Sequence, residues 1–382
     1  MEQLNFVIEA YGVVGIALTA VLLILFVVQI VMHCRKLIFA RFDFTNRPQV
    51  RQEIPAVSII VPLFGEDEEY LKGNFRNLLS QSSAKYEVVA VYVGKEDSFY
   101  ATLNHLRRYY NHLKTTQIDY NPQYPISMRM ALNLGVKSAS NECVIFTTSD
   151  TRPATTDWAY AMARGFMYGD IVLGYCNWAR KSGMQNLFFR KHRFAQTRNS
   201  LVAALRGNCF GASISCLGFT KSLYFKVGGF GHLDLTAGED DLFVQSIATA
   251  DNVCVPLCEQ LRCEDNAPGS LGQWILEQHR LGQTRKFYNT RALNVESCEL
   301  IARVAFFVAA IGVLATLPLE LKGVAALFML VRYLIVSIVD AKCVARVGDK
   351  GICAWAPLYD FFEPWVQLVI RTSQPKRISR WK

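Results

Sequence analysis

Three long stretches of the chain consist almost entirely of uncharged, mainly apolar side chains. Residues 10–32 contain no charged side chain, and residues 304–319 and 323–339 form a pair separated by three residues. At about 1.5 Å per residue the first stretch would make a helix about 34 Å long, which is enough to cross a bilayer. The pattern predicts one N-terminal transmembrane helix and one transmembrane hairpin. A cleaved secretory signal would instead carry its positive charge before a shorter apolar run.

Arg332 is the one charged side chain inside these three stretches. A charge that faces lipid at mid-depth costs about 2.5 to 3.5 kcal/mol even on the more lenient insertion scale. We therefore expect Arg332 to face protein or to extend to the membrane surface.

The positive charge of the chain lies beside the apolar stretches. The formal net charge is +9, of which residues 33–51 carry +4 and residues 371–382 carry +5. Basic segments next to transmembrane helices stay in the cytoplasm and contact anionic lipids, so the charge indicates membrane lipids as partners and no nucleic acid. The region between the first helix and the hairpin is then cytoplasmic. The short chain favours a bacterial inner membrane.

Residues 352–370 are apolar but contain two prolines and two carboxylates. Both flanking segments are expected in the cytoplasm, so an interfacial or re-entrant helix fits better than a fourth span. The expected organisation is a transmembrane helix at 1–33, a basic linker at 34–55, a cytoplasmic domain at 56–298, a transmembrane hairpin at 299–345, and an interfacial segment with a basic tail at 346–382.

Within the cytoplasmic region, runs rich in β-branched residues alternate with helical patterns. Strands are predicted at 56–63, 87–93, 143–148 and 253–257, and helices at 71–81, 99–114 and 127–138. This alternation is typical of an open α/β sheet, which binds ligands at the carboxyl ends of its strands.

The eleven cysteines do not indicate a disulfide or zinc framework. No two of them are spaced as C-x-x-C, and a cytoplasmic domain is kept reduced. The closest group is Cys254, Cys258 and Cys263, which lacks a second half with His or Cys ligands, so we expect buried thiols there.

Four motifs carry a resemblance to one enzyme group. They are VSIIVPLFGED at the first strand, MALNLGVKSASNECVIFTTSDTRP, VGGFGHLDLTAGEDDLF, and WILEQHR beginning at Trp274. In this order, with membrane segments on both sides, they resemble the membrane-bound family 2 glycosyltransferases, the broad group that includes cellulose and hyaluronan synthases and ceramide glucosyltransferases. The resemblance covers the chain from about residue 57 onward. It implies an α/β fold, a GT-A nucleotide-diphospho-sugar transferase domain with a Rossmann-like mixed sheet.

The first motif is expected to hold the nucleoside of the donor. Pro62, Phe64 and Glu66 end the first strand, where a base can stack on apolar surface and a carboxylate can accept hydrogens from the base or ribose. Alone, this segment would also suit a plain strand-to-helix turn. The resemblance implies a further acidic residue after the second strand, which either Glu96 or Asp97 could supply.

The second motif is expected to bind the diphosphate and a divalent cation, Mg²⁺ or Mn²⁺. Arg129 stands where the group commonly has a basic residue, and a guanidinium suits phosphate oxygens, although a solvated charge on a helix face is the alternative. The group has two aspartates one residue apart, whereas here Thr148 replaces the first and Asp150 remains. One carboxylate is enough when phosphate and water supply the other ligands of the metal.

The third motif contains the acidic run Glu239, Asp240 and Asp241. An inverting sugar transfer needs a carboxylate that accepts the proton of the acceptor hydroxyl. The resemblance assigns this role to Asp240 and places its two acidic neighbours in the wall of the acceptor site. The same run would also favour the start of a helix at 242–250 through the helix dipole, and both roles are compatible.

The fourth motif partly matches the Gln-x-x-Arg-Trp stretch of processive synthases. The matching residues, expected on the acceptor side, are Trp274, Gln278, His279 and Arg280. Leu281 and Gly282 stand where the group has Arg and Trp. In processive synthases that Trp stacks on the acceptor sugar, so its absence argues against processivity. A helix lying on the membrane, with Trp274 as its anchor, is the alternative.

Together these features predict an inverting glycosyltransferase. Its donor is expected to be a nucleotide-diphosphate sugar, in the first instance a UDP-sugar, and its acceptor a lipid-linked or membrane-delivered molecule in glycan or glycolipid synthesis. Two alternatives stay open at this point: a processive polysaccharide synthase, and a catalytically inactive membrane scaffold that retains the fold.

Overall fold

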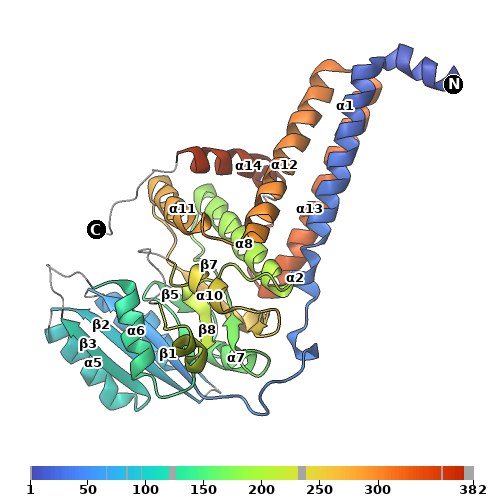
Figure 1. Cartoon of the computed structure of the whole chain (residues 1–382). Coiled ribbons are helices and arrows are strands. Elements are labelled where there is room, and N and C mark those ends of the chain that lie inside the picture. Colours follow the sequence, from blue (N-terminus) through green and yellow to red (C-terminus); the bar gives the residue numbers. More distant parts are fainter. Residues whose placement is uncertain are drawn as a thin grey trace.

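The structure consists of a sheet-containing domain and a bundle of three long helices that project from it (Figure 1). It is a computed structural model and describes residues 2–65, 67–82, 85–95, 97–119, 126–230, 238–353 and 356–373.

Seven strands form the main sheet, in the order β3-β2-β1-β4-β8-β6-β9. Their bounds are β1 Val57–Phe64, β2 Tyr86–Gly94, β3 Leu113–Asp119, β4 Cys143–Phe146, β6 Ile171–Leu173, β8 Leu217–Thr220 and β9 Val253–Cys254. Strands β3, β2, β1 and β4 are parallel, whereas β8 runs antiparallel to both β4 and β6. The sheet is therefore mixed and mainly parallel, as the resemblance implied, and β1 and β4 end at the same edge.

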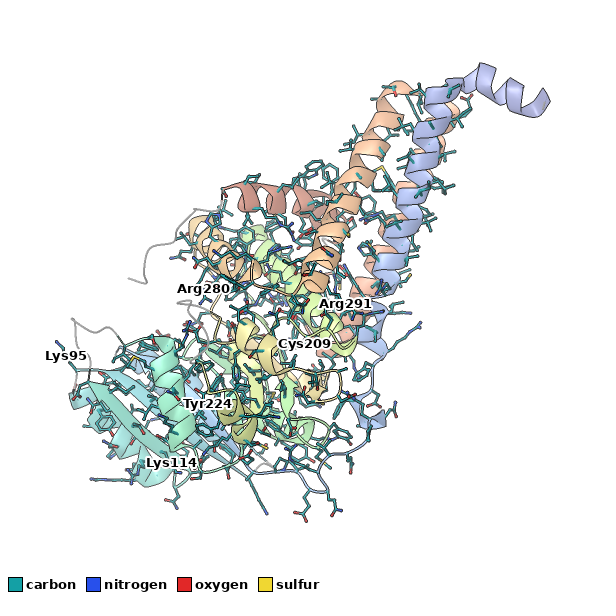
Figure 2. All side chains as sticks on the ribbon, in the orientation of Figure 1. Lys95, Lys114, Cys209, Tyr224, Arg280 and Arg291 are labelled. Carbon is teal, nitrogen blue, oxygen red and sulfur yellow. The ribbon has the colours of Figure 1, made fainter. Side chains whose placement is uncertain are left out.

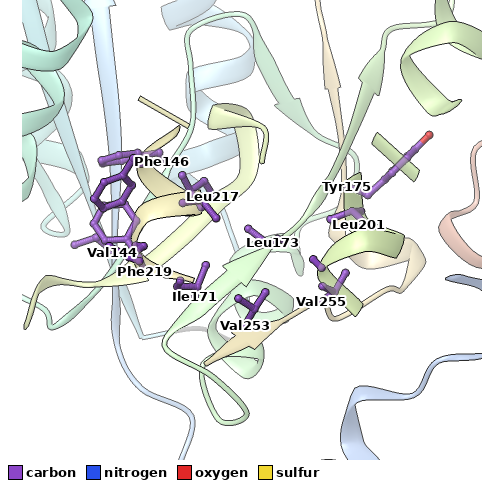
Figure 3. Close-up of a cluster of buried hydrophobic side chains, with 14 of the residues drawn as sticks. Val144, Phe146, Ile171, Leu173, Tyr175, Leu201, Leu217, Phe219, Val253 and Val255 are labelled. Carbon is purple, nitrogen blue, oxygen red and sulfur yellow. The ribbon is translucent and has the colours of Figure 1, made fainter. Parts of the chain in front are cut away.

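Helices cover both faces of this sheet because its strands alternate in the direction of their side chains. Ile60 and Val89 point into one buried cluster, and Ile59 and Val88 point into the other. Part of the first cluster, with side chains from β4, β6, β8, β9 and helix α8 (Met184–Leu205), is drawn in Figure 3. The covering helices are α3 Glu68–Lys72, α4 Asn74–Leu79, α5 Asp97–Tyr109, α6 Met128–Ser138, α7 Trp158–Gly165, α9 Lys221–Lys226 and α10 Asp241–Ile247.

A second, small sheet lies beside the first. It contains β5 Thr151–Pro153, β10 Arg262–Asp265 and β7 Tyr175–Trp178, with β10 in the middle. Strand β10 runs antiparallel to β5, which places Asp265 opposite Thr151. The end of β10 is thereby fixed next to the segment that follows β4.

The remaining helices connect the sheet domain to the long-helix bundle. They are α1 Glu2–Cys34, α2 Leu37–Arg41, α8 Met184–Leu205, α11 Leu271–Arg285, α12 Thr290–Thr316, α13 Leu319–Val347 and α14 Ala356–Thr372, with three 3₁₀ turns at Phe44–Asn46, Ile214–Cys216 and Glu259–Leu261. Of the residues that the structure describes, three segments are long and apolar enough to cross a membrane: Gly12–Arg41, Leu293–Thr316 and Leu319–Val347. Helix α14 runs crosswise to these helices (Figure 1).

Arg332 faces protein, as predicted. Its side chain is 0% exposed and donates to Asp360 of α14 and, over 3.0 Å, to Oε1 of Gln29 in α1. The guanidinium also lies 5.1 Å from the ring centres of Phe306 and Phe307. The charge is thus paired inside the helix bundle and does not contact lipid.

Three predicted helices and two predicted strands differ from the structure. The helix expected at 242–250 ends at Ile247, and the strands expected at 143–148 and 253–257 end at Phe146 and Cys254. The helix expected at 71–81 is two short helices, α3 and α4, which break at Gly73, whose φ of −109° and ψ of −95° are not helical. The helix expected at 99–114 ends at Tyr109, because Leu113–Asp119 instead forms β3 and pairs with β2. A ladder with a neighbouring strand here outweighs the local helical pattern. The helix predicted at 127–138 and the strands predicted at 56–63 and 87–93 agree with α6, β1 and β2 to within one residue.

Candidate active site

A single large cavity joins the edge of the main sheet to the long helices. Its volume is about 1640 Å³. At the sheet end it is lined by the end of β1, by Thr148–Asp150 after β4 and by the start of α6. At the other end it is lined by residues such as Leu300 of α12, Val336 of α13 and Gln367 of α14. Most of the predicted site residues that the structure describes lie on its wall.

The end of β1 forms an apolar part of this wall. Pro62 and Phe64 both line the cavity, and the Phe64 side chain is 42% exposed. Asp67, which no sequence argument singled out, lines it as well, and its carboxylate accepts from the backbone N–H of Tyr70 at 2.8 Å. The wall offers an apolar surface next to an acceptor group, which suits a nucleoside.

Three of the predicted nucleoside contacts cannot be placed in this wall. Glu66 and Glu96 lie outside the described residues, and Asp97 begins α5 with a side chain that is not described. These three assignments therefore stay predictions.

Arg129 and Glu239 bring the second and third motifs together. The Nε of Arg129, near the start of α6, donates to Oε1 of Glu239 over 3.2 Å. Burial raises the pKa of Glu239, and the guanidinium of Arg129 opposes this effect. A guanidinium and a carboxylate that are far apart in the sequence thus meet on the cavity wall.

Asp240 and Asp241 have different surroundings at the start of α10. The Asp240 side chain is half-buried, caps the helix by accepting from the backbone N–H of Asp241 at 2.9 Å, and faces the cavity. Asp241 is 5% exposed and accepts from the hydroxyls of Thr284 at 2.5 Å and Tyr288 at 2.6 Å. Asp241 therefore fastens α10 to the end of α11 and the residues after it, whereas Asp240 can meet an acceptor hydroxyl.

The surroundings of Asp241 predict a pH dependence of stability. Burial, reinforced by the charge of Asp240, raises the pKa of Asp241 to about 6. The folded protein then holds the proton more tightly than the unfolded chain, whose Asp pKa is about 3.9, so folding stability falls by about 2 to 3 kcal/mol as the pH rises from about 4 to about 6. Asp241→Asn should lose this component. Melting temperatures in detergent at about pH 4.5 and 7.5 test it, and an equal pH dependence in both proteins would contradict the assignment.

Asp150, for which the sequence predicts contact with a metal, follows β4. Its exposed carboxylate lines the cavity, and its Oδ1 accepts from Nδ2 of Asn266 at 3.1 Å. Within the described ranges no three His, Cys, Asp or Glu side chains form a cluster that would enclose a metal ion. An exposed carboxylate on the cavity wall fits a cation that takes most of its ligands from a diphosphate and water.

The fourth motif is divided between the cavity wall and the protein interior. Gln278 and Arg280 line the cavity, and Arg280 is paired with Glu277 over 2.8 Å. Figure 2 shows Arg280 extending from α11 toward the sheet domain. The Oε1 of Gln278 accepts from Nε2 of Gln196 in α8 at 2.8 Å, which ties the two helices together.

Trp274 and His279 are not on the cavity wall, contrary to their predicted place on the acceptor side. Trp274 is 1% exposed and stacks on Phe189 of α8, with ring centres 5.2 Å apart. His279 is buried and its Nε2 lies 3.1 Å from the hydroxyl of Ser373. Trp274 is enclosed by protein, so it is also no anchor in the membrane surface. Both residues pack α11 against its neighbours.

Several cavity residues had no signal in the sequence. The loop after α8 contributes Phe210, Gly211 and Ser213 to the wall, and the hydroxyl of Ser200 donates to the carbonyl of Gly211 at 2.7 Å. A Cβ at Gly211 would lie 3.0 Å from that hydroxyl oxygen, so the close approach favours glycine. The run of small residues is the one feature of the sequence that could have indicated a lining segment.

The sequence model of glycosyl transferase family 21 matches residues 18–368. No curated protein matches the chain. Among solved structures, the mannosyltransferase PcManGT from Pyrobaculum calidifontis, in complex with GDP-Man and Mn²⁺, is similar over 87% of this chain and 100% of its own, with 16% identity and a TM-score of 0.52. Residues 1–349 of S. aureus TarS are similar over 85% of this chain and 94% of that one, with 16% identity and a TM-score of 0.40.

The fold and the family match agree. The mixed sheet corresponds to the GT-A fold, and the match to the family runs from the first long helix into α14. The chain therefore belongs to glycosyl transferase family 21, the ceramide glucosyltransferase-like family of the broader group that its motifs resemble, and it is a glycosyltransferase.

Proposed function

We propose that this protein transfers one sugar, with inversion, from a nucleotide-diphosphate sugar to a hydroxyl group of an acceptor that arrives from the membrane. The observation that carries the proposal is the continuous cavity, which joins the carboxyl edge of the sheet to the helices of the membrane bundle and has Asp240 on its wall. A UDP-sugar is the first candidate for the donor. PcManGT was solved with GDP-Man and Mn²⁺, which supports a nucleotide sugar and a divalent cation as partners.

Each side chain on the sheet side has a chemical role in this proposal. Phe64 and Pro62 give the nucleoside an apolar surface, and Arg129 lies where it can donate to diphosphate oxygens. Asp240 accepts the proton of the attacking hydroxyl as the bond to the sugar forms. Asp150 would hold a divalent cation, Mg²⁺ or Mn²⁺, which neutralises charge on the departing diphosphate.

The membrane side of the cavity suits an uncharged acceptor group. Most of its charges occur in sets of opposite charge that link the residue before α2 with α8, α12, α13 and α14; Arg371, which also lines this end, donates to Gln367. These sets are Lys36 and Arg303 with Glu299, Arg303 with Glu363, Arg332 with Asp360, and Lys191 and Arg198 with Asp340. Because each guanidinium or ammonium in these sets already faces a carboxylate, this end does not favour a phosphate group, whereas carboxylates accept readily from hydroxyls.

A single transfer fits the structure better than processive synthesis. The part of the chain that the structure describes has three candidate membrane spans, too few to enclose a polymer channel within one chain. Trp274, the aromatic side chain of the fourth motif, is packed against Phe189 and cannot stack on a sugar in the cavity. We therefore favour transfer of one sugar per acceptor.

We further propose that the catalytic domain is cytoplasmic, in a bacterial inner membrane, because the basic segments adjoin the inner ends of the spans. A topology reporter fused after Lys382 should then read cytoplasmic. A reporter inserted at Lys322, next to the turn between α12 and α13, should read outside. The reverse pair of readings would contradict this orientation.

A donor screen tests the proposed function. The purified full chain in detergent should gain thermal stability from one class of UDP, GDP or CDP sugar, by about 2.7 kcal/mol at 100 times its dissociation constant. The corresponding nucleoside monophosphates serve as controls. A chain that none of the nucleotide sugars stabilises would contradict the proposal.

A further inference from the structure

The residue that replaces the first aspartate of the metal motif is linked to a buried carboxylate. Thr148 Oγ1 lies 2.8 Å from Thr151 Oγ1, and Thr151 Oγ1 donates to Oδ1 of Asp265 at 2.8 Å. Asp265 ends β10 and is 6% exposed. Thr148 and Asp265 both line the cavity, so the link runs along its wall.

The chemistry of these groups fixes the direction of the hydrogen bonds. The carboxylate of Asp265 can only accept, and Arg193 Nη2 lies 3.6 Å from its Oδ2 as a counter-charge. Thr151 has one hydroxyl proton, which it gives to Asp265. Thr148 must therefore donate its own proton to Thr151. The lone pairs of Thr148 Oγ1 are then left for a ligand in the cavity.

The end of β10 also holds the neighbouring carboxylate, that of Asp150, in place. Asn266, which follows Asp265, donates from its backbone N–H to the carbonyl of Asp150 and from Nδ2 to Oδ1 of Asp150, each at 3.1 Å. The backbone N–H of Thr151 donates to the carbonyl of Thr148 at 3.1 Å. The end of β10 therefore fixes the positions of both the Thr148 hydroxyl and the Asp150 carboxylate.

We propose that Thr148 Oγ1 is a second protein oxygen, beside Asp150, for the divalent cation of the bound donor. Thr151 and Asp265 are positioning residues that keep the proton of Thr148 away from the cavity. The proposal rests on the metal-dependent donor of the proposed function.

Charge explains why a hydroxyl stands at position 148. An aspartate there would face Asp265 across the single proton of Thr151, and two carboxylates that share one proton repel each other. A threonine supplies a neutral oxygen and lets Asp265 keep its place. Oxygen ligands of this kind suit Mg²⁺ and Mn²⁺ when phosphate supplies the charge.

The test is the gain in nucleotide affinity that Mn²⁺ produces, measured without turnover. The affinities of the full chain in detergent for UDP and for GDP are determined by titration calorimetry with Mn²⁺ and with excess EDTA. Thr148→Val removes the hydroxyl and keeps nearly the same side-chain shape, so it should reduce the Mn²⁺-dependent gain in nucleotide affinity by about 10- to 100-fold. Thr151→Val breaks the link to Asp265 and should reduce the same gain by about 10-fold.

A matched control and a reversal complete the experiment. Thr155→Val removes a hydroxyl that donates to the carbonyl of Gln260 at 3.1 Å, outside the cavity lining, and should leave the Mn²⁺-dependent gain unchanged. Thr151→Ser returns a hydroxyl proton to Asp265 and should reverse the loss seen in Thr151→Val to within about 2-fold of the wild type.

The outcomes separate this proposal from the proposed function. An undiminished Mn²⁺-dependent gain in Thr148→Val and Thr151→Val would overturn the role of Thr148 and leave the proposed function intact. An affinity loss in these variants that is the same in EDTA as in Mn²⁺ would overturn it as well. A wild-type chain that binds a nucleotide equally with and without Mn²⁺ would contradict the metal-dependent donor and this proposal together.

Discussion

Asp240→Asn is expected to lower sugar transfer by about 100- to 10,000-fold while leaving donor affinity nearly unchanged. The amide has the shape of the carboxylate but cannot take up the proton of the acceptor hydroxyl. Asp240 also caps α10 through its bond to the backbone N–H of Asp241, and asparagine is an equally good cap, so the variant should fold. Single-turnover transfer and nucleotide titration measure the two quantities separately.

Two neighbouring substitutions are the controls for Asp240. Glu239→Gln and Asp241→Asn should each cost less activity, because Glu239 is paired with Arg129 and Asp241 is held by Thr284 and Tyr288. If the acidic run only supported the helix, all three variants would lose about 0.3 to 1 kcal/mol of stability and little activity. Equal small losses in the three variants would therefore rule out Asp240 as the base.

Asp150→Asn is expected to remove most of the metal-dependent donor affinity and to reduce turnover by about 100-fold or more, because a metal stabilises a departing diphosphate by several kcal/mol. The asparagine keeps the size of the side chain and can still accept from Asn266, so the loss should come from the missing charge. Donor titration with and without Mn²⁺ measures it. Undiminished turnover in this variant, or of the wild type in excess chelator, would exclude Asp150 as a metal ligand.

The central parallel strands could be predicted from the sequence, whereas β3 lies in a stretch with a helical pattern and the short strands β6 and β8 give no signal. Strands β1 and β2 are continuous buried runs, so their β-branched residues indicate them directly. Strands β6 and β8 have three and four residues, which is too short for a period to be recognised. Their pairing depends on contacts that are distant in the sequence.

Helix α8 shows why the link to the membrane helices was not foreseen. Its buried face contains Arg190, Lys191 and Arg198, which look like solvent-exposed residues in the sequence. They are buried because Asp340 and Asp349, near the C-terminal end of α13 and just after it, supply carboxylates. Such pairing is a property of the tertiary structure, and a hydrophobic period cannot reveal it.

The candidate site was partly predictable for a simple geometric reason. Arg129 lies at the start of α6, Asp150 just after β4 and Asp240 at the start of α10, and all three line one cavity. Its motif predicts Trp274 on the acceptor side, but the packing of α8 against α11 encloses the side chain. Asp265 had no motif at all, and its role depends on the pairing of β10 with β5.

The most direct test of the proposed function is the fate of a labelled sugar. The full chain in lipid nanodiscs is supplied with the nucleotide sugar that stabilises it in the donor screen, carrying a label in its sugar. The sample is extracted, and the label is counted in the organic and in the aqueous phase. We expect the label in the organic phase, with one sugar per lipid and an inverted anomeric configuration. With Asp240→Asn, the organic phase should contain at most about 1% of the label found with the wild type. Label that stays in the aqueous phase as free sugar or polymer, in equal amounts for both proteins, would contradict a single transfer to a membrane acceptor with Asp240 as the base.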